Sequence, residues 1–562
     1  MKKKRKKNKP RYELFVVLCI LVVAVIGFIA YLIDQKTPSK TYEDLNAYYS
    51  IENENEAAVI VDGTLEEKKA IIQDGKYYLN YEDVLSAVNK RLYYDETENL
   101  FCVATPTELH TFEIESLETE NDVISVDETL YVSLDFLKNW SDIETQVSEE
   151  PSRIAITTKW DYTAKIVNDT ECIRAKASIK GNIIHECTQG ENLRVVDTDE
   201  EVPEGWIKVV TADGLMGYIR SSYLNDDDTV MANHVSALGE YTSIHLDESP
   251  NVAFYQSDNP STNTTLSDKL ANASGLNVVC PTWYFLDGPG EITTNFDQDF
   301  VDTCHENGYQ VWALINDIDG QVTSSEGTYN ALKATSDRQA IIRTMMDTAL
   351  EYGVDGINVD LEHVSQDGVY SYLEFIRELS VECRNNGLIL SVDTYVPMNY
   401  SLYLDREEQG EVADYVIIMC YDEHYSGSEE AGSVSSLNFL ENGLNRTLRE
   451  VSADKIIAAI PFYTRLWETS GDNAPDSTVM GMKAANEYAK ANNMEIVWDE
   501  TVGQNVAELE EDGTLYQIWL EDAESIKAKM EKISEYNVAG VAEWCLGLED
   551  EDVWGVISSY LD

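Results

Sequence analysis

Three polar side chains alternate with apolar ones in the segment DGINVDLE, namely Asn358, Asp360 and Glu362. If the segment is a β-strand, side chains two residues apart point to the same face, so these three lie in one row. A buried polar row costs free energy unless it is hydrogen-bonded, which argues against a purely structural role. Carboxylates held side by side raise one pKa, so one group is expected to stay protonated near neutral pH. A protonated Glu362 beside an ionisable Asp360 fits general-acid cleavage of a glycosidic bond.

The elements that would position this row extend over residues 234–562. Eight strand-like runs alternate there with amphipathic helical runs, which is the size and rhythm of a (β/α)8 TIM barrel. The runs are NVAFYQ, LNVVCPTW, YQVWALIN, GINVDLE, LILSVDTYVP, YVIIMCYD, KIIAAIPFY and GVAEWCLG. The polar row ends the fourth run and therefore faces the carboxyl-terminal mouth, where barrel enzymes work. No second, distant carboxylate is evident as a nucleophile.

The last crossover of this barrel is long and predicts a small α+β insertion. It contains a helix near Met480 to Asn492, a hairpin through Asp512-Gly513 and a helix from Ala523 to Tyr536. An insertion at this place would stand beside the mouth.

DGINVDLE resembles the DGxDxDxE signature of glycoside hydrolase family 18. The segments CPTWY, VWALI, MCYDEH, IPFYTRLW, IWLEDAESI and AEWCLG resemble that family's bacterial wall-lytic and spore-cortex-lytic N-acetylglucosaminidases. The resemblance implies retaining catalysis assisted by the substrate. Glu362 would protonate the leaving oxygen, and Asp360 would hold the acetamido N–H while the sugar's own carbonyl attacks the anomeric carbon.

Further site residues are implied by the same resemblance. Tyr421 would donate a hydrogen bond to the acetamido oxygen, and Trp544 would form the apolar floor under the reacting ring. The other expected substrate-binding residues are Met419, Asp422, Trp283 and, within the row, Asn358. For the aromatic residues, ordinary core packing is the alternative, and it is equally open for Trp283 and Trp519.

One position departs from the family's pattern. Asn358 stands where the signature has its middle aspartate, so a carboxylate that could share a proton with Asp360 is replaced by an amide. The amide can still hydrogen-bond Asp360, and we expect activity to survive with a shifted pH profile.

The N-terminus predicts a membrane anchor. Eight Lys and Arg residues between Lys2 and Arg11 precede an uncharged apolar run, residues 14–33. Twenty residues at about 1.5 Å each reach roughly 30 Å, enough to span a bilayer. A cleaved signal peptide is the alternative, but Tyr31 to Asp34 offers no small-residue cleavage site. The basic tail, residues 1–13, should stay cytoplasmic, which places the catalytic domain outside the membrane.

Between anchor and barrel we expect a linker and two small domains. Residues 34–56 read as the linker, and residues 57–160 resemble the copper amine oxidase N-terminal domain, with no copper implied. Residues 161–226 resemble a bacterial Src-homology-3-like domain, with Arg174, Trp206, Gly217 and Tyr218 at the family's positions. Such domains often bind cell-wall peptides, although Trp206 is equally compatible with a core position.

Composition excludes several classes of function. With 41 basic and 102 acidic side chains the formal charge is −61, which repels nucleic acid. The nine cysteines form no CxxC pair and the seven histidines no HExxH, so no metal site and no cofactor is expected. Cys172 and Cys187 could form a disulfide or remain two buried thiols.

The sequence thus predicts a membrane-anchored hydrolase of β-1,4 bonds after N-acetylglucosamine in peptidoglycan. A chitinase acting on a related N-acetyl glycan remains an alternative. A non-catalytic glycan-binding scaffold is the alternative of another class, although this chain keeps Glu362, Asp360, Tyr421 and Trp544 together.

Overall fold

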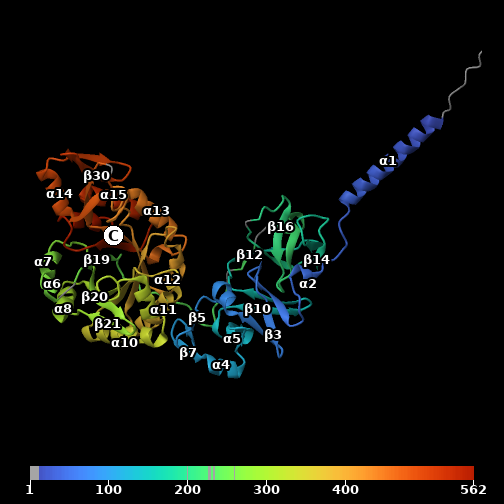
Figure 1. Cartoon of the computed structure of the whole chain (residues 1–562), viewed down its shortest axis with the longest axis horizontal. Coiled ribbons are helices and arrows are strands. Elements are labelled where there is room, and N and C mark those ends of the chain that lie inside the picture. The colour runs from blue at the N-terminus through green and yellow to red at the C-terminus, as the bar shows by residue number, and fades with distance from the viewer. Residues whose placement is uncertain are drawn as a thin grey trace, which may run out of the picture. The chain divides into compact units, whose positions relative to one another are not determined.

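The computed structural model describes residues 12–198, 200–225, 229–231, 234–257, 260–471 and 473–561. Of the predicted basic tail, residues 1–11 lie outside this range. The chain forms two compact units (Figure 1). Unit 1 comprises residues 1–90 and 115–238, and unit 2 comprises residues 91–114 and 239–562.

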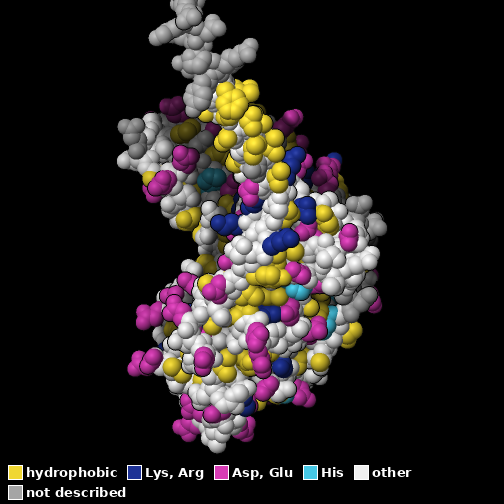
Figure 2. All heavy atoms as spheres, turned by 90° about the vertical axis from the view of Figure 1, so that its right-hand side faces the viewer, with side chains coloured by type: hydrophobic (Ala, Val, Ile, Leu, Met, Phe, Trp, Pro, Cys, Tyr) yellow, Lys and Arg dark blue, Asp and Glu magenta, His cyan; other side chains and the backbone are white. Residues whose placement is uncertain are grey.

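Helix α1 (Tyr12–Lys36) is apolar along almost its whole length. Its apolar side chains are exposed and form a continuous surface in Figure 2. Among the described residues, Phe15–Lys36 is the one helical stretch long and apolar enough to cross a membrane. Membrane anchors and signal sequences share these properties.

Two sheets make up the rest of unit 1. The first has the order β10, β11, β1, β3, β4, β9, β8, with β2 beside β1. Its strands are β1 (Glu56–Val61), β2 (Thr64–Leu65), β3 (Ala70–Gln73), β4 (Lys76–Asn80), β8 (Val123–Val126), β9 (Thr129–Ser133), β10 (Glu144–Glu149) and β11 (Ser152–Thr157). The accompanying helices are α2 (Leu45–Tyr48), α3 (Tyr81–Asp83), η1 (Val84–Val88), α4 (Ile114–Glu120) and α5 (Leu134–Trp140).

The second sheet is antiparallel and covers the segment predicted to be Src-homology-3-like. Its order is β14, β13, β17, β16, β15, β12, β18. The strands are β12 (Tyr162–Ile166), β13 (Glu171–Arg174), β14 (Ile183–Cys187), β15 (Asn192–Val195), β16 (Trp206–Val210), β17 (Met216–Arg220) and β18 (Thr229–Met231), with η2 (Ser221–Tyr223) after β17. Cys172 and Cys187 are both free thiols, so the predicted alternative of a disulfide is not realised here.

Unit 2 contains a closed barrel of eight parallel strands, as predicted. Its order is β19, β32, β26, β25, β24, β23, β22, β20, and β20 pairs with β19 to close the ring. The strands are β19 (Asn251–Tyr255), β20 (Val278–Gly288), β22 (Gln310–Asn316), β23 (Gly356–Asp360), β24 (Ile389–Tyr395), β25 (Tyr415–Met419), β26 (Ile456–Pro461) and β32 (Gly540–Trp544). They are nearly continuous apolar runs because both faces of a parallel sheet are covered.

Helices surround the barrel strands (Figure 1). They are α6 (Pro260–Asn263), α7 (Leu266–Leu270), α8 (Gln298–Glu306), α9 (Ser325–Leu332), α10 (Thr335–Tyr352), α11 (Val369–Asn386), α12 (Arg406–Val412), α13 (Leu437–Thr447), α15 (Ala523–Ser534) and α16 (Val553–Ser558), with short turns η3 (Leu402–Leu404) and η4 (Ala453–Lys455). The two longest, α10 and α11, end at Gly353 and Gly387, which take the left-handed conformation that glycine allows. Strand β21 (Glu291–Thr294) pairs with the end of β20.

The last crossover forms a five-stranded antiparallel sheet with one helix. Its elements are β27 (Tyr463–Ser470), β28 (Asp476–Gly481), α14 (Met482–Ala491), β29 (Glu495–Asp499), β30 (Gln504–Glu511) and β31 (Thr514–Leu520). The chain returns through α15, whose first turn is closed by a capping box between Asp522 and Ser525.

Residues 91–114 belong to unit 2 although they lie inside the segment predicted as one domain, 57–160. They form the three-stranded sheet β5 (Leu92–Asp95), β6 (Leu100–Ala104) and β7 (Leu109–Glu113). Arg91 donates to both carboxylate oxygens of Glu408 at 2.8 and 3.1 Å, and Arg377 donates to the same carboxylate at 2.7 Å. Asp95 accepts from the backbone and hydroxyl of Thr335, both at 2.6 Å. Buried charged contacts therefore bind this sheet to the barrel's helices.

Candidate active site

The predicted polar row has a partner row on the neighbouring strand. Asn358 of β23 lies beside Ser391 of β24 in parallel register. Continued along both strands, this register sets Asp360 beside Asp393. The Nδ2 atom of Asn358 donates to Ser391 Oγ at 2.9 Å and to Asp393 Oδ1 at 2.8 Å. Both rows face the inside of the barrel, because the alternate residues Leu390 and Val392 pack in the outer layer against the helices.

Glu362 is held just beyond the end of β23. Tyr395 Oη, from the end of β24, donates a hydrogen bond to Glu362 Oε2. The buried carboxylate of Asp317 accepts the backbone N–H of Glu362 at 2.8 Å and that of His363 at 3.0 Å. Thr328 Oγ1 donates to the same carboxylate at 2.7 Å. The acid's backbone and side chain are therefore fixed by separate contacts.

The electrostatics of the row favour protonated carboxyl groups. Burial raises the pKa of Glu362; the hydrogen bond from Tyr395 lowers it, and the charges of Asp317 and Asp422 raise it again. Burial, then the charges of Glu362 and Asp393, raise the pKa of Asp360 well above its usual range. Buried Asp360 Oδ1 accepts no hydrogen bond from the described residues. The site therefore combines an acid, Glu362, whose pKa is raised with a buried oxygen of Asp360 that lacks a hydrogen-bond donor.

Tyr421 lies two residues beyond the end of β25, on the face that Met419 also occupies. Burial, then the charges of Asp360 and Asp393, raise the pKa of Tyr421 well above its usual range, so the hydroxyl stays a neutral donor. Asp422 follows with φ 56°, and its Oδ1 accepts from Tyr463 Oη of β27 at 2.7 Å. Met419 is buried and Asp422 is exposed. Tyr421 thus lies near enough to Asp360, and Asp422 near enough to Glu362, for their charges to interact.

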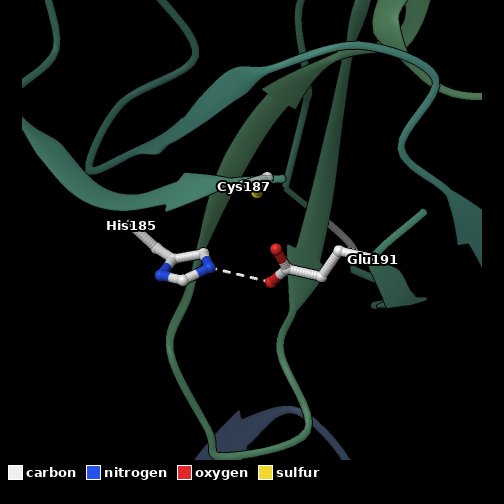
Figure 3. Close-up of side chains that lie close together, drawn as sticks. All are labelled: His185, Cys187 and Glu191. Carbon is white, nitrogen blue, oxygen red and sulfur yellow. Dashed lines mark hydrogen bonds and ion pairs between the residues drawn. The ribbon is translucent and has the colours of Figure 1, made fainter. Parts of the chain in front are cut away.

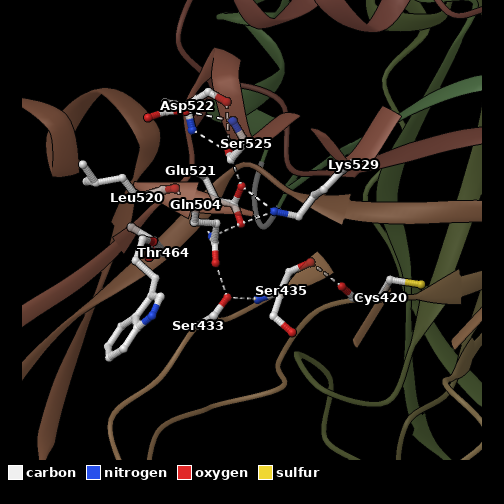
Figure 4. A network of polar contacts seen from close by, with 12 residues as sticks. Cys420, Ser433, Ser435, Thr464, Gln504, Leu520, Glu521, Asp522, Ser525 and Lys529 are labelled. Atoms are coloured by element: carbon white, nitrogen blue, oxygen red, sulfur yellow. Dashed lines mark hydrogen bonds and ion pairs between the residues drawn. The ribbon is translucent and has the colours of Figure 1, made fainter. Parts of the chain in front are cut away.

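A buried polar network supports the loop that carries Tyr421 (Figure 4). Lys529 of α15 contacts both oxygens of Glu521 at 2.7 and 2.8 Å, with both side chains fully buried. Gln504 of β30 donates to Glu521 Oε1 at 2.7 Å and accepts from Ser433 Oγ. The network continues through Ser435, whose Oγ donates to the carbonyl of Cys420 at 2.7 Å. The inserted sheet and α15 therefore connect to the residue directly before Tyr421.

The tryptophans occupy different surroundings. Trp544 ends β32, is half-buried and contacts the Phe254 ring at 5.3 Å between centroids. In the strand order, β32 and β23 lie on opposite sides of the barrel, so Trp544 faces the polar row across the mouth. Trp283 has no exposed surface; it packs on Phe296 and Phe300 and donates to Ser257 Oγ at 3.1 Å. The expectation that Trp283 contacts substrate is therefore not supported, because its ring fills the layer between barrel and helices.

One cluster within the described residues has the composition of a metal site, and it lies in unit 1. Its members are His185, Cys187 and Glu191, whose ligand atoms lie within 4.8 Å of one another (Figure 3). His185 Nε2 already hydrogen-bonds Glu191 Oε1 at 2.7 Å, and Cys187 is buried in the apolar core of its sheet. These contacts account for the cluster as the closure of the β14–β15 connection.

Three residues of the site escaped the sequence analysis. Asp393 and Tyr395 alternate along LILSVDTYVP in the way that Asp360 and Glu362 alternate along DGINVDLE. The same test of alternation, applied to the next strand, would have found them. Asp317 had no such signal, since its contacts with the backbone of Glu362 and His363 join residues 45 and 46 positions apart.

Comparisons with known proteins agree with this geometry. Residues 251–549, more than half of the chain, match the model of "Glycosyl hydrolases family 18". The uncharacterized glycosylase YvbX of Bacillus subtilis is 22% identical over 292 residues, covering 50% of this chain and 84% of that protein. The cortical fragment-lytic enzyme of Bacillus subtilis is 27% identical over 256 residues, covering 44% of this chain and 58% of that enzyme.

Solved structures show the same fold. The spore cortex-lytic enzyme SleL of Bacillus cereus has a TM-score of 0.51 at 20% identity, covering 56% of this chain and 74% of that one. A chitinase from Chromobacterium violaceum has a TM-score of 0.50 at 23% identity, covering 56% of this chain and 98% of that one.

Proposed function

This chain belongs to glycosyl hydrolase family 18, and from that premise we propose that it cleaves β-1,4 bonds after N-acetylglucosamine in peptidoglycan, outside the membrane to which α1 anchors it. The observation that carries the proposal is the inward row of Asp360 and Glu362 with Tyr421 beside it and Trp544 across the mouth. No other carboxylate need act as nucleophile, because the acetamido group of the substrate supplies one.

The first step is the transfer of the Glu362 proton to the glycosidic oxygen. As the bond from that oxygen to the anomeric carbon breaks, the acetamido carbonyl oxygen bonds to the same carbon and an oxazolinium ion forms. Asp360 accepts the acetamido N–H, giving its buried Oδ1 the donor it needs. Tyr421 donates to the acetamido oxygen and orients it for attack. The ring above Trp544 stacks its C–H face on the indole.

The second step returns the enzyme to its starting state. Water attacks the anomeric carbon, the bond to the acetamido oxygen breaks, and the Glu362 carboxylate takes the water's proton. Two displacements at one carbon give net retention of configuration. Met419 and Asp422 line the same subsite, and Asn358 positions the row from below.

The choice of peptidoglycan rests on the other parts of the chain that accompany the barrel. A membrane anchor and a sheet domain resembling wall-peptide binders suit an enzyme that works on the cell wall. The basic tail would remain cytoplasmic, which would leave the residues after the membrane helix outside. Chitin and its oligosaccharides supply the same N-acetyl group, so a chitinase is the alternative that the substrate test decides.

The test uses the full chain in detergent with purified peptidoglycan and with chitin oligosaccharides. Mass spectrometry should find new reducing-end N-acetylglucosamine from peptidoglycan, and no cleavage once the substrate is N-deacetylated. Glu362→Gln should lose about 10²- to 10⁴-fold in rate, the usual contribution of a general acid. Glu543→Gln is the matched control, because Glu543 is a fully buried carboxyl on the outward face of β32. If Glu362→Gln cuts as fast as the wild type, or neither glycan is cut, the proposal is wrong.

A further inference from the structure

The signature of this family places a carboxylate where this chain has Asn358, yet the site does not lack a further carboxylate. Asp393 lies on the adjacent strand β24, inside the barrel and 4% exposed. It accepts a hydrogen bond from Asn358 Nδ2 at 2.8 Å. A third acidic group, Asp393, is thus present beside Asp360 and Glu362 of the sequence motif.

The register of the two strands gives this carboxylate its position. Asn358 pairs with Ser391 and Val359 with Val392, so the next pair along is Asp360 with Asp393. Neighbouring strands lie about 4.8 Å apart, so the side chains of such a pair are adjacent on one face of the sheet. The Tyr395 to Glu362 hydrogen bond, two residues further on, shows that the register continues to the mouth.

We propose that Asp393 takes the role of the carboxylate missing at position 358, and that Asp360 and Asp393 together hold one proton. This inference rests on the proposed function, since it concerns the residue that receives the acetamido N–H. Asp393 is a positioning residue, because it acts on the substrate only through Asp360.

The proton stays within the pair throughout the reaction. In the free enzyme it lies on Asp360. As positive charge develops on the oxazolinium ion, it moves to Asp393 Oδ2, since Asn358 already donates to Oδ1. Asp360 is then ionised and accepts the acetamido N–H. When water opens the intermediate, the proton returns to Asp360, so the pair gains and loses none.

The surroundings of the pair favour a single shared proton. Burial raises the pKa of Asp393 well above its usual range, the hydrogen bond from Asn358 lowers it, and the charge of Glu362 raises it again. The charges of Glu362, Asp317 and Asp319 act on the Asp360–Asp393 pair. The charge of the pair in turn acts on the hydroxyls of Tyr372, Tyr395 and Tyr421 and on the thiol of Cys280. Burial raises the pKa of each hydroxyl and of the thiol, so these groups are neutral near pH 7.

The kinetic test compares the full-length wild type with Asp393→Asn and with the swap Asn358→Asp/Asp393→Asn. Without Asp393, Asp360 must lose its proton to solvent before it can act, so the acid limb of kcat/KM against pH moves to higher pH. At the pH of the wild-type acid limb the rate should fall about tenfold for each pKa unit of that shift. The swap returns a carboxylate to the row and should recover most of the loss. An unmoved acid limb in Asp393→Asn, or a swap no better than Asp393→Asn, overturns the proposal.

A second measurement does not depend on turnover. A double-mutant cycle of Asp360→Asn and Asp393→Asn is measured on the folding equilibrium of the full chain at several pH values. Groups that share a proton should be coupled by about tenfold or more, and the coupling should change with pH. Additive effects at every pH would refute the shared proton. If no glycan is cut but coupling is present, the proposed function fails while the pairing stands.

Discussion

Removing one hydroxyl from the site should move its pH profile upward. Tyr395→Phe deletes the hydrogen bond from Tyr395 Oη to Glu362 Oε2 and leaves the ring in place. That bond lowers the pKa of Glu362, against the burial that raises it. A hydrogen bond to a charged group contributes roughly 1.5–3 kcal/mol, and part of this is kept when the carboxyl is protonated. At about 1.4 kcal/mol per unit, we expect the pKa of Glu362 to rise by about one.

Glu362 must be protonated to act, so a higher pKa keeps it competent at higher pH. The alkaline limb of kcat/KM, which reports the free enzyme, should therefore shift up by about one pH unit in Tyr395→Phe. Tyr403→Phe is the matched control, because its hydroxyl donates to the backbone carbonyl of Val364 at 2.8 Å and not to Glu362. An alkaline limb that stays fixed or moves down in Tyr395→Phe would refute the assigned role of this contact.

Two other variants test the supports of the site. Asp317→Asn removes a carboxylate oxygen that accepts the backbone N–H groups beyond β23, and kcat should fall about tenfold or more because Glu362 is held less firmly. The variant also removes a charge that raises the pKa of Glu362, so the alkaline limb of kcat/KM should move to lower pH, opposite to its shift in Tyr395→Phe. A limb that moves up would contradict this reasoning. Lys529→Met leaves the buried Glu521 carboxylate without its cation, and calorimetry should show the barrel destabilised by about 3–5 kcal/mol. Lys527→Met is the control: Lys527 is exposed and pairs with Glu531 at the surface, so its loss should change stability little. Equal effects of the two lysine variants would show that the buried pair contributes no more than the surface pair.

The barrel and its polar row could be predicted because both depend on local periodicity. Apolar runs that alternate with amphipathic helical runs predicted the eight strands, and a spacing of two residues placed Asp360 and Glu362 on one face. The helix expected near Met480 to Asn492 spans Met482–Ala491, and the hairpin expected at Asp512-Gly513 joins β30 to β31. These features are written into short stretches of chain.

What could not be predicted depends on the register between neighbouring strands and on how side chains pack between the barrel and its helices. Asp393 enters the site only because β23 and β24 align Asn358 with Ser391. Trp283 was expected at the substrate because of the resemblance to the family, yet its ring packs against Phe300 of α8. Such facts come from contacts between distant residues, for which a single sequence carries no periodic signal.

The sheet of residues 91–114 also bears on how the chain reaches its native state. The hydrogen bond from Arg91 to Glu408 joins residues 317 positions apart. A chain made from its N-terminus therefore completes these strands long before their partners exist, and closing so large a loop is slow. Until the second half is made, β5 exposes Leu92 and β6 exposes Phe101 and Val103, which are fully or almost fully buried in the native unit. Folding of this unit thus requires either time or a binding partner that covers these strands before the two ends of the unit meet.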